Sequence, residues 1–137
     1  MMMIEPKFRC GTREAINKLA TELNMPFDEW MQDWPYEVAN SEEIEKYISH
    51  YRKVTDDDEK FVLMQAIIQA AEDQKQQEQF LKYWLIVQEL LKQDFQIHEY
   101  TIYYWSCFDT QDIQDCFKIS VFMRDLFVNQ KEKTLEA

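Results

Sequence analysis

Glycine is almost missing from this chain. Gly11 is the only glycine among 137 residues, where an average usage of ~7% would give about ten. Proline is also scarce, with three residues. Glycine gives the backbone the freedom to turn tightly or to approach a phosphate closely. P-loops, dinucleotide-binding fingerprints and nucleophile elbows each need more than one glycine, so the sequence excludes all three.

Histidine and cysteine are too few and too scattered to predict a metal site. The two histidines, His50 and His98, lie far apart in the sequence. The three cysteines, Cys10, Cys107 and Cys116, include no C-x-x-C pair. Structural zinc sites need several such ligands at short, regular spacing. We therefore expect neither a metal nor another cofactor.

Signals for export or membrane insertion are also missing. The amino terminus lacks the basic region and the long apolar region of a secretion signal. The longest apolar-rich stretches, 61–71 and 83–87, are too short to cross a bilayer. An odd number of sparse cysteines is typical of a reducing compartment. We expect a cytoplasmic protein that does not span a membrane.

Apolar residues recur three and four positions apart along most of the chain, which is the period of an amphipathic helix. The pattern predicts helices over 12–23, 26–34, 40–51, 55–72, 80–93, 97–105 and 109–129. The segment 55–72 is apolar nearly all round, which predicts a central buried helix. The segment 97–105 favours a strand by propensity, but its apolar residues do not alternate, so we predict a helix there.

These helices and their short connections predict an all-α fold. Six to seven helices would form a compact bundle or a short stack of helical hairpins. The length fits a single domain over 1–137. Residues 1–10 and 130–137 are expected to be frayed or extended ends.

Acidic residues exceed basic ones by a wide margin. The chain has 26 Asp and Glu against 15 Lys and Arg, a formal net charge of -11. This charge disfavours nucleic acid and anionic membranes and favours basic proteins, although solubility alone also explains an acidic composition. The windows 19–45 and 93–117 hold eight and five acidic residues, contain no Lys or Arg, and are rich in aromatic residues.

Aromatic residues set among carboxylates are what a docking face for a basic protein needs, because rings supply affinity and charges supply steering. We therefore predict a non-enzymatic interaction protein, with an antidote of the immunity type as the favoured form. The residues predicted to contact the partner are Asp28, Glu29, Asp33, Trp34, Glu37, Asp109, Asp112 and Asp115. The competing interpretation is that the aromatic stripe of an amphipathic helix over 26–34 is buried core.

Two other functions remain open at this level. A small cytosolic enzyme would need a pocket near His98 and Cys107, among Tyr100 and Tyr104, in which His98 lies close to Cys107 or to a carboxylate. A homodimeric structural or adaptor protein would pack Trp30 and Trp34 across a two-fold axis. The position of His98 relative to Cys107 and the exposure of the tryptophans distinguish these alternatives.

Overall fold

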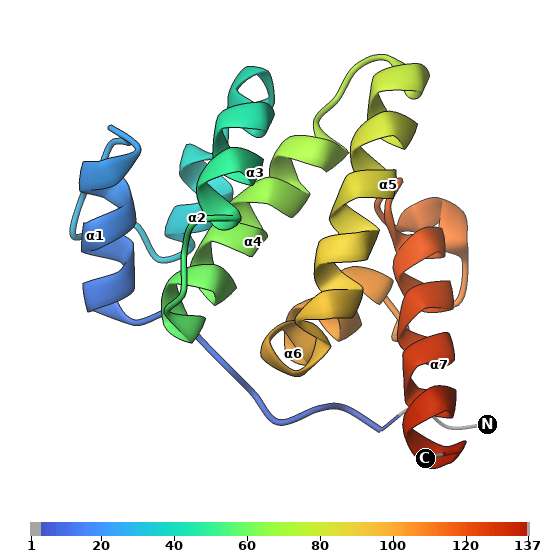
Figure 1. Ribbon diagram of the computed structural model, residues 1–137. Helices are drawn as coiled ribbons and strands as arrows, with labels where there is room; N and C mark the ends of the chain where they lie inside the picture. The colour runs from blue at the N-terminus through green and yellow to red at the C-terminus, as the bar shows by residue number, and fades with distance from the viewer. Residues whose placement is uncertain (1–3, 137) are drawn as a thin grey trace. The chain divides into compact units, whose positions relative to one another are not determined.

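The structure is a computed structural model that describes residues 4–136, and its α-helices are labelled in Figure 1. The described residues contain seven α-helices and two short 3-10 helices, with no strand among them. In chain order these are α1 (Arg13–Glu22), α2 (Trp34–Val38), η1 (Ser41–Glu43), α3 (Ile44–Tyr51), α4 (Asp57–Glu72), α5 (Gln77–Gln93), α6 (Phe95–Ser106), η2 (Ile113–Asp115) and α7 (Ser120–Glu136). The predicted all-α fold is confirmed, as is the helical state of 97–105.

The contacts divide the chain into two compact units. The N-terminal unit comprises residues 10–83, and the C-terminal unit comprises residues 4–9 and 84–136. The boundary falls inside α5, between Tyr83 and Trp84. A single domain over the whole chain stays a prediction.

Helix α4 is the core of the N-terminal unit. It packs against α1, α2 and α3, which lie around it in Figure 1. Its apolar residues from Phe61 to Ala71 are buried on nearly every side, as the sequence predicts. Full burial of a large apolar side chain contributes about 1.5–3 kcal/mol, so this helix supplies much of the stability of the unit.

Gly11 lets the chain enter α1 close to α4. A Cβ atom at this position would lie 2.7 Å from Cγ2 of Val62, which is fully buried in α4. The next residue, Thr12, then caps α1, because its side-chain oxygen accepts a hydrogen bond from the backbone N–H of Ala15. The single glycine therefore stands where the backbone and a neighbouring helix leave no room for a side chain.

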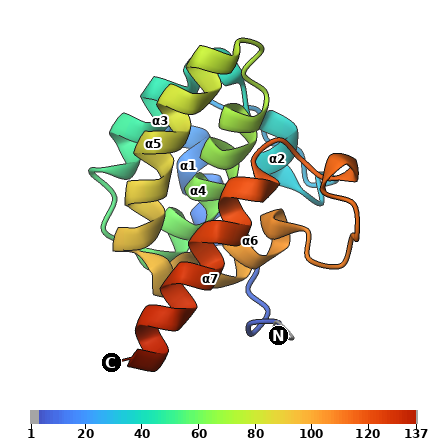
Figure 2. The same cartoon turned by 90° about the vertical axis from the view of Figure 1, so that its right-hand side faces the viewer.

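Helices α6 and α7 form the centre of the C-terminal unit, and they lie against each other in Figure 2. Ile102 and Trp105 of α6 and Met123 and Phe127 of α7 are all buried. The Ser120 hydroxyl at the start of α7 donates a hydrogen bond of 2.7 Å to the carbonyl of Trp105. This bond fixes the first turn of α7 against the last turn of α6.

The helix predicted over 26–34 is absent. Residues 25–33 are irregular, with a turn at residues 29–30 and a bend at 32–33, and α2 begins only at Trp34, with Pro35 in its first turn. The Asp28 carboxylate accepts a hydrogen bond from the N–H of Trp30 at 3.0 Å, which offers the backbone a local turn in place of a helix. Proline is well suited to a first turn, because its missing N–H has no helical partner there.

The last predicted helix also has different ends. Residues 107–119 are irregular apart from η2, whose N-cap is Asp112, so α7 begins at Ser120. At the other end α7 runs on through residues 130–136, where we expected a frayed or extended tail. Residues 4–10 form no helix or strand, and residues 1–3 and 137 lie outside the described part of the chain.

Candidate functional site

Residues 25–33, here called the N-terminal acidic loop, connect α1 to α2 and expose two aromatic side chains. Trp30 is 86% exposed and Phe27 is 42% exposed. Three carboxylates of the same loop, on Asp28, Glu29 and Asp33, are exposed as well. The loop therefore presents an indole ring surrounded in sequence by negative charge.

The backbone of this loop is held by contacts within the N-terminal unit. The Trp34 indole N–H donates a hydrogen bond of 2.7 Å to the carbonyl of Pro26. The N–H of Asp33 donates to the Glu37 carboxylate at 3.1 Å, and the N–H of Met31 donates to the carbonyl of Asp28 at 3.0 Å. Trp30 is thus exposed on a loop whose backbone is held in place by hydrogen bonds.

Trp34 is not available to a partner. Its side chain is 1% exposed, because it heads α2 and packs into the core around α4. The prediction that Trp34 contacts a partner is therefore corrected: its ring holds the loop in place and Trp30 occupies the surface. Glu37, on α2, is exposed.

Residues 107–119, here called the C-terminal acidic loop, carry the second group of predicted contacts. Asp109, Asp112 and Asp115 are all exposed on it. It belongs to the C-terminal unit, whereas the N-terminal acidic loop belongs to the N-terminal unit. Two apolar side chains of this loop, Ile113 and Phe117, are also exposed.

Arg124 of α7 fixes the start of the C-terminal acidic loop. Its guanidinium donates hydrogen bonds to the carbonyls of Ser106 at 2.6 Å, Cys107 at 2.7 Å and Thr110 at 3.2 Å. Cys107 itself has a φ of 60°, a left-handed conformation that is uncommon outside glycine. The guanidinium of Arg124 therefore holds the turn at Cys107 in its left-handed conformation.

A cavity of about 440 Å³ opens in the C-terminal unit beside this turn. Its lining residues are Glu5, Tyr100, Tyr103, Tyr104, Cys107, Phe108, Asp109, Thr110 and Phe117. Three of the four residues expected for an enzyme pocket, Tyr100, Tyr104 and Cys107, thus lie together.

The fourth expected residue, His98, is fully buried and does not line this cavity. The Cys107 thiol donates to the Thr110 hydroxyl at 3.3 Å instead. Burial and the neighbouring Cys107 thiol raise the pKa of Cys116, which disfavours its thiolate. The cavity, as far as its described lining shows, holds a thiol without an imidazole beside it.

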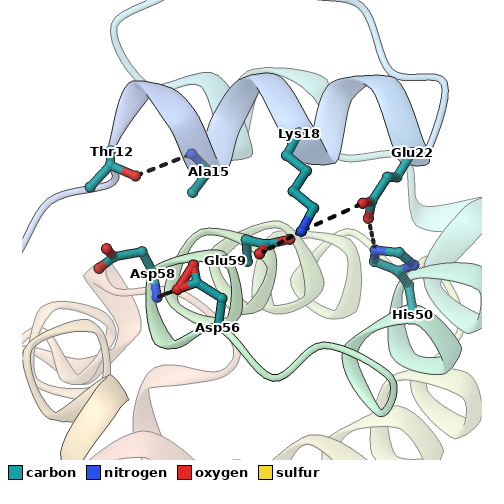
Figure 3. Close-up of polar contacts among 8 residues, drawn as sticks. All are labelled: Thr12, Ala15, Lys18, Glu22, His50, Asp56, Asp58 and Glu59. Atoms are coloured by element: carbon teal, nitrogen blue, oxygen red, sulfur yellow. Dashed lines mark hydrogen bonds and ion pairs between the residues drawn. The ribbon is translucent and has the colours of Figure 1, made fainter.

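A charged cluster that the sequence does not reveal links α1, α3 and α4 (Figure 3). Nζ of Lys18 lies 3.2 Å from Oε2 of Glu59 and 3.9 Å from Oε1 of Glu22. Nε2 of His50 lies 2.7 Å from Oε2 of Glu22. The Glu59 side chain is only 7% exposed, and its hydrogen bond raises the pKa of Lys18. The cluster joins three helices and explains His50 as a structural residue.

Glu59 could have been noticed as an acid at the edge of the apolar run that starts at Phe61. Its position near the start of α4 suggested only a favourable charge at a helix end. Its partner, Lys18, is far away in the sequence, so the ion pair depends on how α1 packs against α4.

The residues that the structure describes contain no group of three His, Cys, Asp or Glu side chains placed to hold a metal ion. Within the same residues, no helix combines the length and apolar character needed to cross a membrane. Comparison with known protein families, curated proteins and solved structures finds no match to this chain.

Proposed function

We propose that the chain is an interaction protein that binds a basic protein, and that the N-terminal acidic loop is its main contact surface. The observation that carries this proposal is the exposure of Trp30 between Asp28, Glu29 and Asp33. The Trp30 side chain is 86% exposed on a loop that hydrogen bonds hold in place. Exposure of an apolar ring to water is unfavourable, and binding of another surface over the ring would remove this cost.

Tryptophan is among the residues that contribute most to protein–protein affinity. A ring that leaves water on binding gains the free energy of apolar burial, and a nearby cation can also rest on its face. Carboxylates around it raise the association rate of a positively charged partner and repel anionic ones. The aromatic ring and the carboxylates of the loop therefore both favour a positively charged protein as the partner.

Along the sequence, the charge around the loop has one sign over a long stretch, and Lys46 of α3 is a lysine that the fold brings beside its start, with a hydrogen bond of 3.0 Å to the carbonyl of Leu23. From residue 19 to residue 45 the sequence has no Lys or Arg, and Glu37, Glu42 and Glu43 are exposed after the loop. A partner with a cationic site, such as a toxin that acts on nucleic acid, fits such a surface, because carboxylates compete with phosphates for the same cations. We propose an antidote of the immunity type in the cytoplasm as the form of this function.

The C-terminal acidic loop is proposed as a second contact surface through Asp109, Asp112 and Asp115. Its exposed Ile113 and Phe117 supply apolar area beside the three carboxylates. Whether one partner reaches both loops is decided by variants of each loop alone and of both together.

The test is affinity capture with the full-length chain, its variants and a matched control, followed by identification of the bound proteins. W30A removes the exposed ring, and E29K/D33K reverses the charge of two carboxylates. Asp28 is kept, because its carboxylate accepts a hydrogen bond from the backbone N–H of Trp30. D73K/E89K is the control, since it reverses two exposed acids outside both loops.

We expect wild type and control to retain one and the same basic protein, and W30A and E29K/D33K each to lose it. The variant D109K/D115K measures how much the C-terminal acidic loop contributes to binding of the partner. Equal retention by all variants would contradict the proposal. Self-association of the wild type that W30A abolishes would also contradict it, because the occupant would then be a second copy of this chain.

A further inference from the structure

The cavity in the C-terminal unit has an aromatic and acidic lining. Of the nine lining residues that the structure describes, five carry aromatic rings: Tyr100, Tyr103, Tyr104, Phe108 and Phe117. Glu5 and Asp109 add two carboxylates. The lining within the described chain includes neither Lys nor Arg. A ligand that enters therefore meets rings and two carboxylates, and the guanidinium of Arg124 lies behind the lining, where it donates to the carbonyls of Cys107 and Thr110.

The spacing of the tyrosines explains why they meet here. Tyr100, Tyr103 and Tyr104 are three and four residues apart on α6, which places them on one face of the helix. Two ring contacts hold this wall: Tyr103 lies 5.6 Å from Phe108, and Tyr100 lies 5.2 Å from Phe8 between ring centres. Phe117, which also lines the cavity, packs on the buried Trp105, with 4.5 Å between the ring centres.

One ring of the lining already interacts with a cation. The guanidinium carbon of Arg124 lies 5.6 Å from the centre of the Phe108 ring. The face of an aromatic ring carries partial negative charge and attracts ammonium and guanidinium groups within about 6 Å. Arg124 therefore already occupies a face of Phe108, and the remaining rings of the lining, together with its carboxylates, favour an organic cation over a neutral or an anionic ligand.

We propose that this cavity binds a small organic cation through its alkylated ammonium group, with the rings of α6 around the methyl groups and Glu5 and Asp109 balancing the charge. A volume of about 440 Å³ lies within the range of ~300–1,000 Å³ typical of small-molecule sites. The proposal is independent of the binding of a basic protein by the N-terminal acidic loop.

An alkylated ammonium fits better than a metal ion. Among the described lining residues only Glu5 and Asp109 carry carboxylates, and the described residues include no cluster of three metal-binding side chains. Rings cannot coordinate a hard divalent cation, which needs six or more oxygen ligands. They can surround a cation whose charge is spread over methyl groups and whose hydration is weak.

The test is a titration of the full-length chain with choline, followed by NMR of the aromatic resonances and by calorimetry. The comparison ligand is 3,3-dimethylbutan-1-ol, in which a carbon replaces the charged nitrogen at nearly the same size. We expect choline to bind at least about tenfold more tightly than the neutral alcohol. Equal affinities, or no binding of choline, would overturn the proposal.

Variants locate the site. Tyr104 is 49% exposed, so Y104A removes a ring without opening the core, and Y104F keeps the ring. Y104A and D109N should each weaken choline binding several-fold, while Y104F and W30A, whose residue is not among the lining residues, should bind like wild type. Should Y104A fail to fold, D109N and the neutral alcohol still decide the question. Undiminished binding by D109N and Y104A would overturn it.

A peptide with one trimethyl-lysine presents the same ammonium group on a protein chain. We expect it to bind no more tightly than choline if the ligand is a free small molecule. Much tighter binding of the peptide would assign the cavity to a modified protein side chain and would overturn the small-molecule assignment.

Discussion

Trp30 and Trp34 are close in the sequence but have opposite environments. Trp30 projects from the N-terminal acidic loop into solvent, and Trp34 is sealed in the core of its unit. The indole N–H of Trp34 is satisfied by the carbonyl of Pro26, so this side chain contributes both packing and a hydrogen bond. The two residues make a matched pair for mutagenesis.

We expect W34A to lower the free energy of unfolding by about 3–5 kcal/mol, because it leaves a large cavity in the core. W30A should change it by less than about 0.5 kcal/mol, as is usual for an exposed side chain. Urea denaturation followed by circular dichroism measures both. A large loss of stability in W30A would mean that its ring is packed rather than exposed.

The sequence places both tryptophans on one stripe, and this is where prediction failed. The spacing of Phe27, Trp30, Met31 and Trp34 is helical, yet the Asp28 carboxylate bonds the N–H of Trp30 and sets a turn. Short acidic side chains compete with helical hydrogen bonds in this way. Periodicity records which side chains would align in a helix, and it does not register this local competition.

Tyr47 gives the fold a sensitivity to alkaline pH. Its side chain is buried, and burial raises its pKa above the ordinary value, while its oxygen accepts a hydrogen bond from the N–H of Asn40 at 3.1 Å. The unfolded chain releases this proton at a lower pH than the folded chain does. The contribution of Tyr47 to the free energy of unfolding is therefore fully present below about pH 10, and it is lost as the pH rises through the raised pKa of this residue.

We expect Y47F to show a shallower loss of stability above about pH 10 than wild type, because the ionisable hydroxyl is gone. At neutral pH it should cost only about 1 kcal/mol, the usual value of one hydrogen bond. The remaining slope belongs partly to Tyr83, whose pKa burial also raises. Identical pH profiles for Y47F and wild type would contradict this role of Tyr47.

At the scale of the helices, the contact of α1 with α4 depends on the missing side chain at Gly11. We expect G11A to destabilise the protein by about 1–3 kcal/mol, because the new methyl group collides with Val62. In a V62A background the same substitution should cost much less. A double-mutant cycle with denaturation measures the coupling, and purely additive effects would show that no such collision exists.

The ends of helices separate what could be predicted from what could not. Helix α4 was predictable, because Phe61 to Ala71 is apolar on nearly every side and needs burial wherever it packs. The start of α7 was not, because Ser120 and Arg124 bond to carbonyls of residues 105–110. Such contacts between distant residues leave no periodic signal, and the cavity beside them was predictable only in part, through Tyr100, Tyr104 and Cys107.

Arg124 should control the order of the C-terminal acidic loop. R124K keeps the charge but loses the planar fork that reaches three carbonyl groups. We expect limited proteolysis to cut within 107–119 several-fold faster in R124K, with helix content nearly unchanged. Unaltered cleavage would mean that the loop is held by other contacts.

At the scale of the whole molecule, the net charge of -11 is unevenly distributed along the sequence, although Glu22, Glu45 and Glu99 form ion pairs with Lys18, Lys82 and Lys131. The windows 19–45 and 93–117 together hold thirteen of the acidic residues and no Lys or Arg, and each unit contains one acidic loop with exposed apolar residues. The rest of the chain carries nearly balanced charge. Long-range attraction should therefore act mainly at these loops, and added salt should weaken it.

The measurement that tests the account most directly is the affinity of the captured basic protein for wild type and E29K/D33K across a salt series. Between about 0.01 M and about 1 M salt the screening length falls from about 30 Å to about 3 Å. We expect the wild-type affinity to fall steeply over this range and that of E29K/D33K to be weak and nearly flat. A wild-type affinity that does not respond to salt, or equals that of E29K/D33K throughout, would contradict the proposal that the N-terminal acidic loop binds a basic partner.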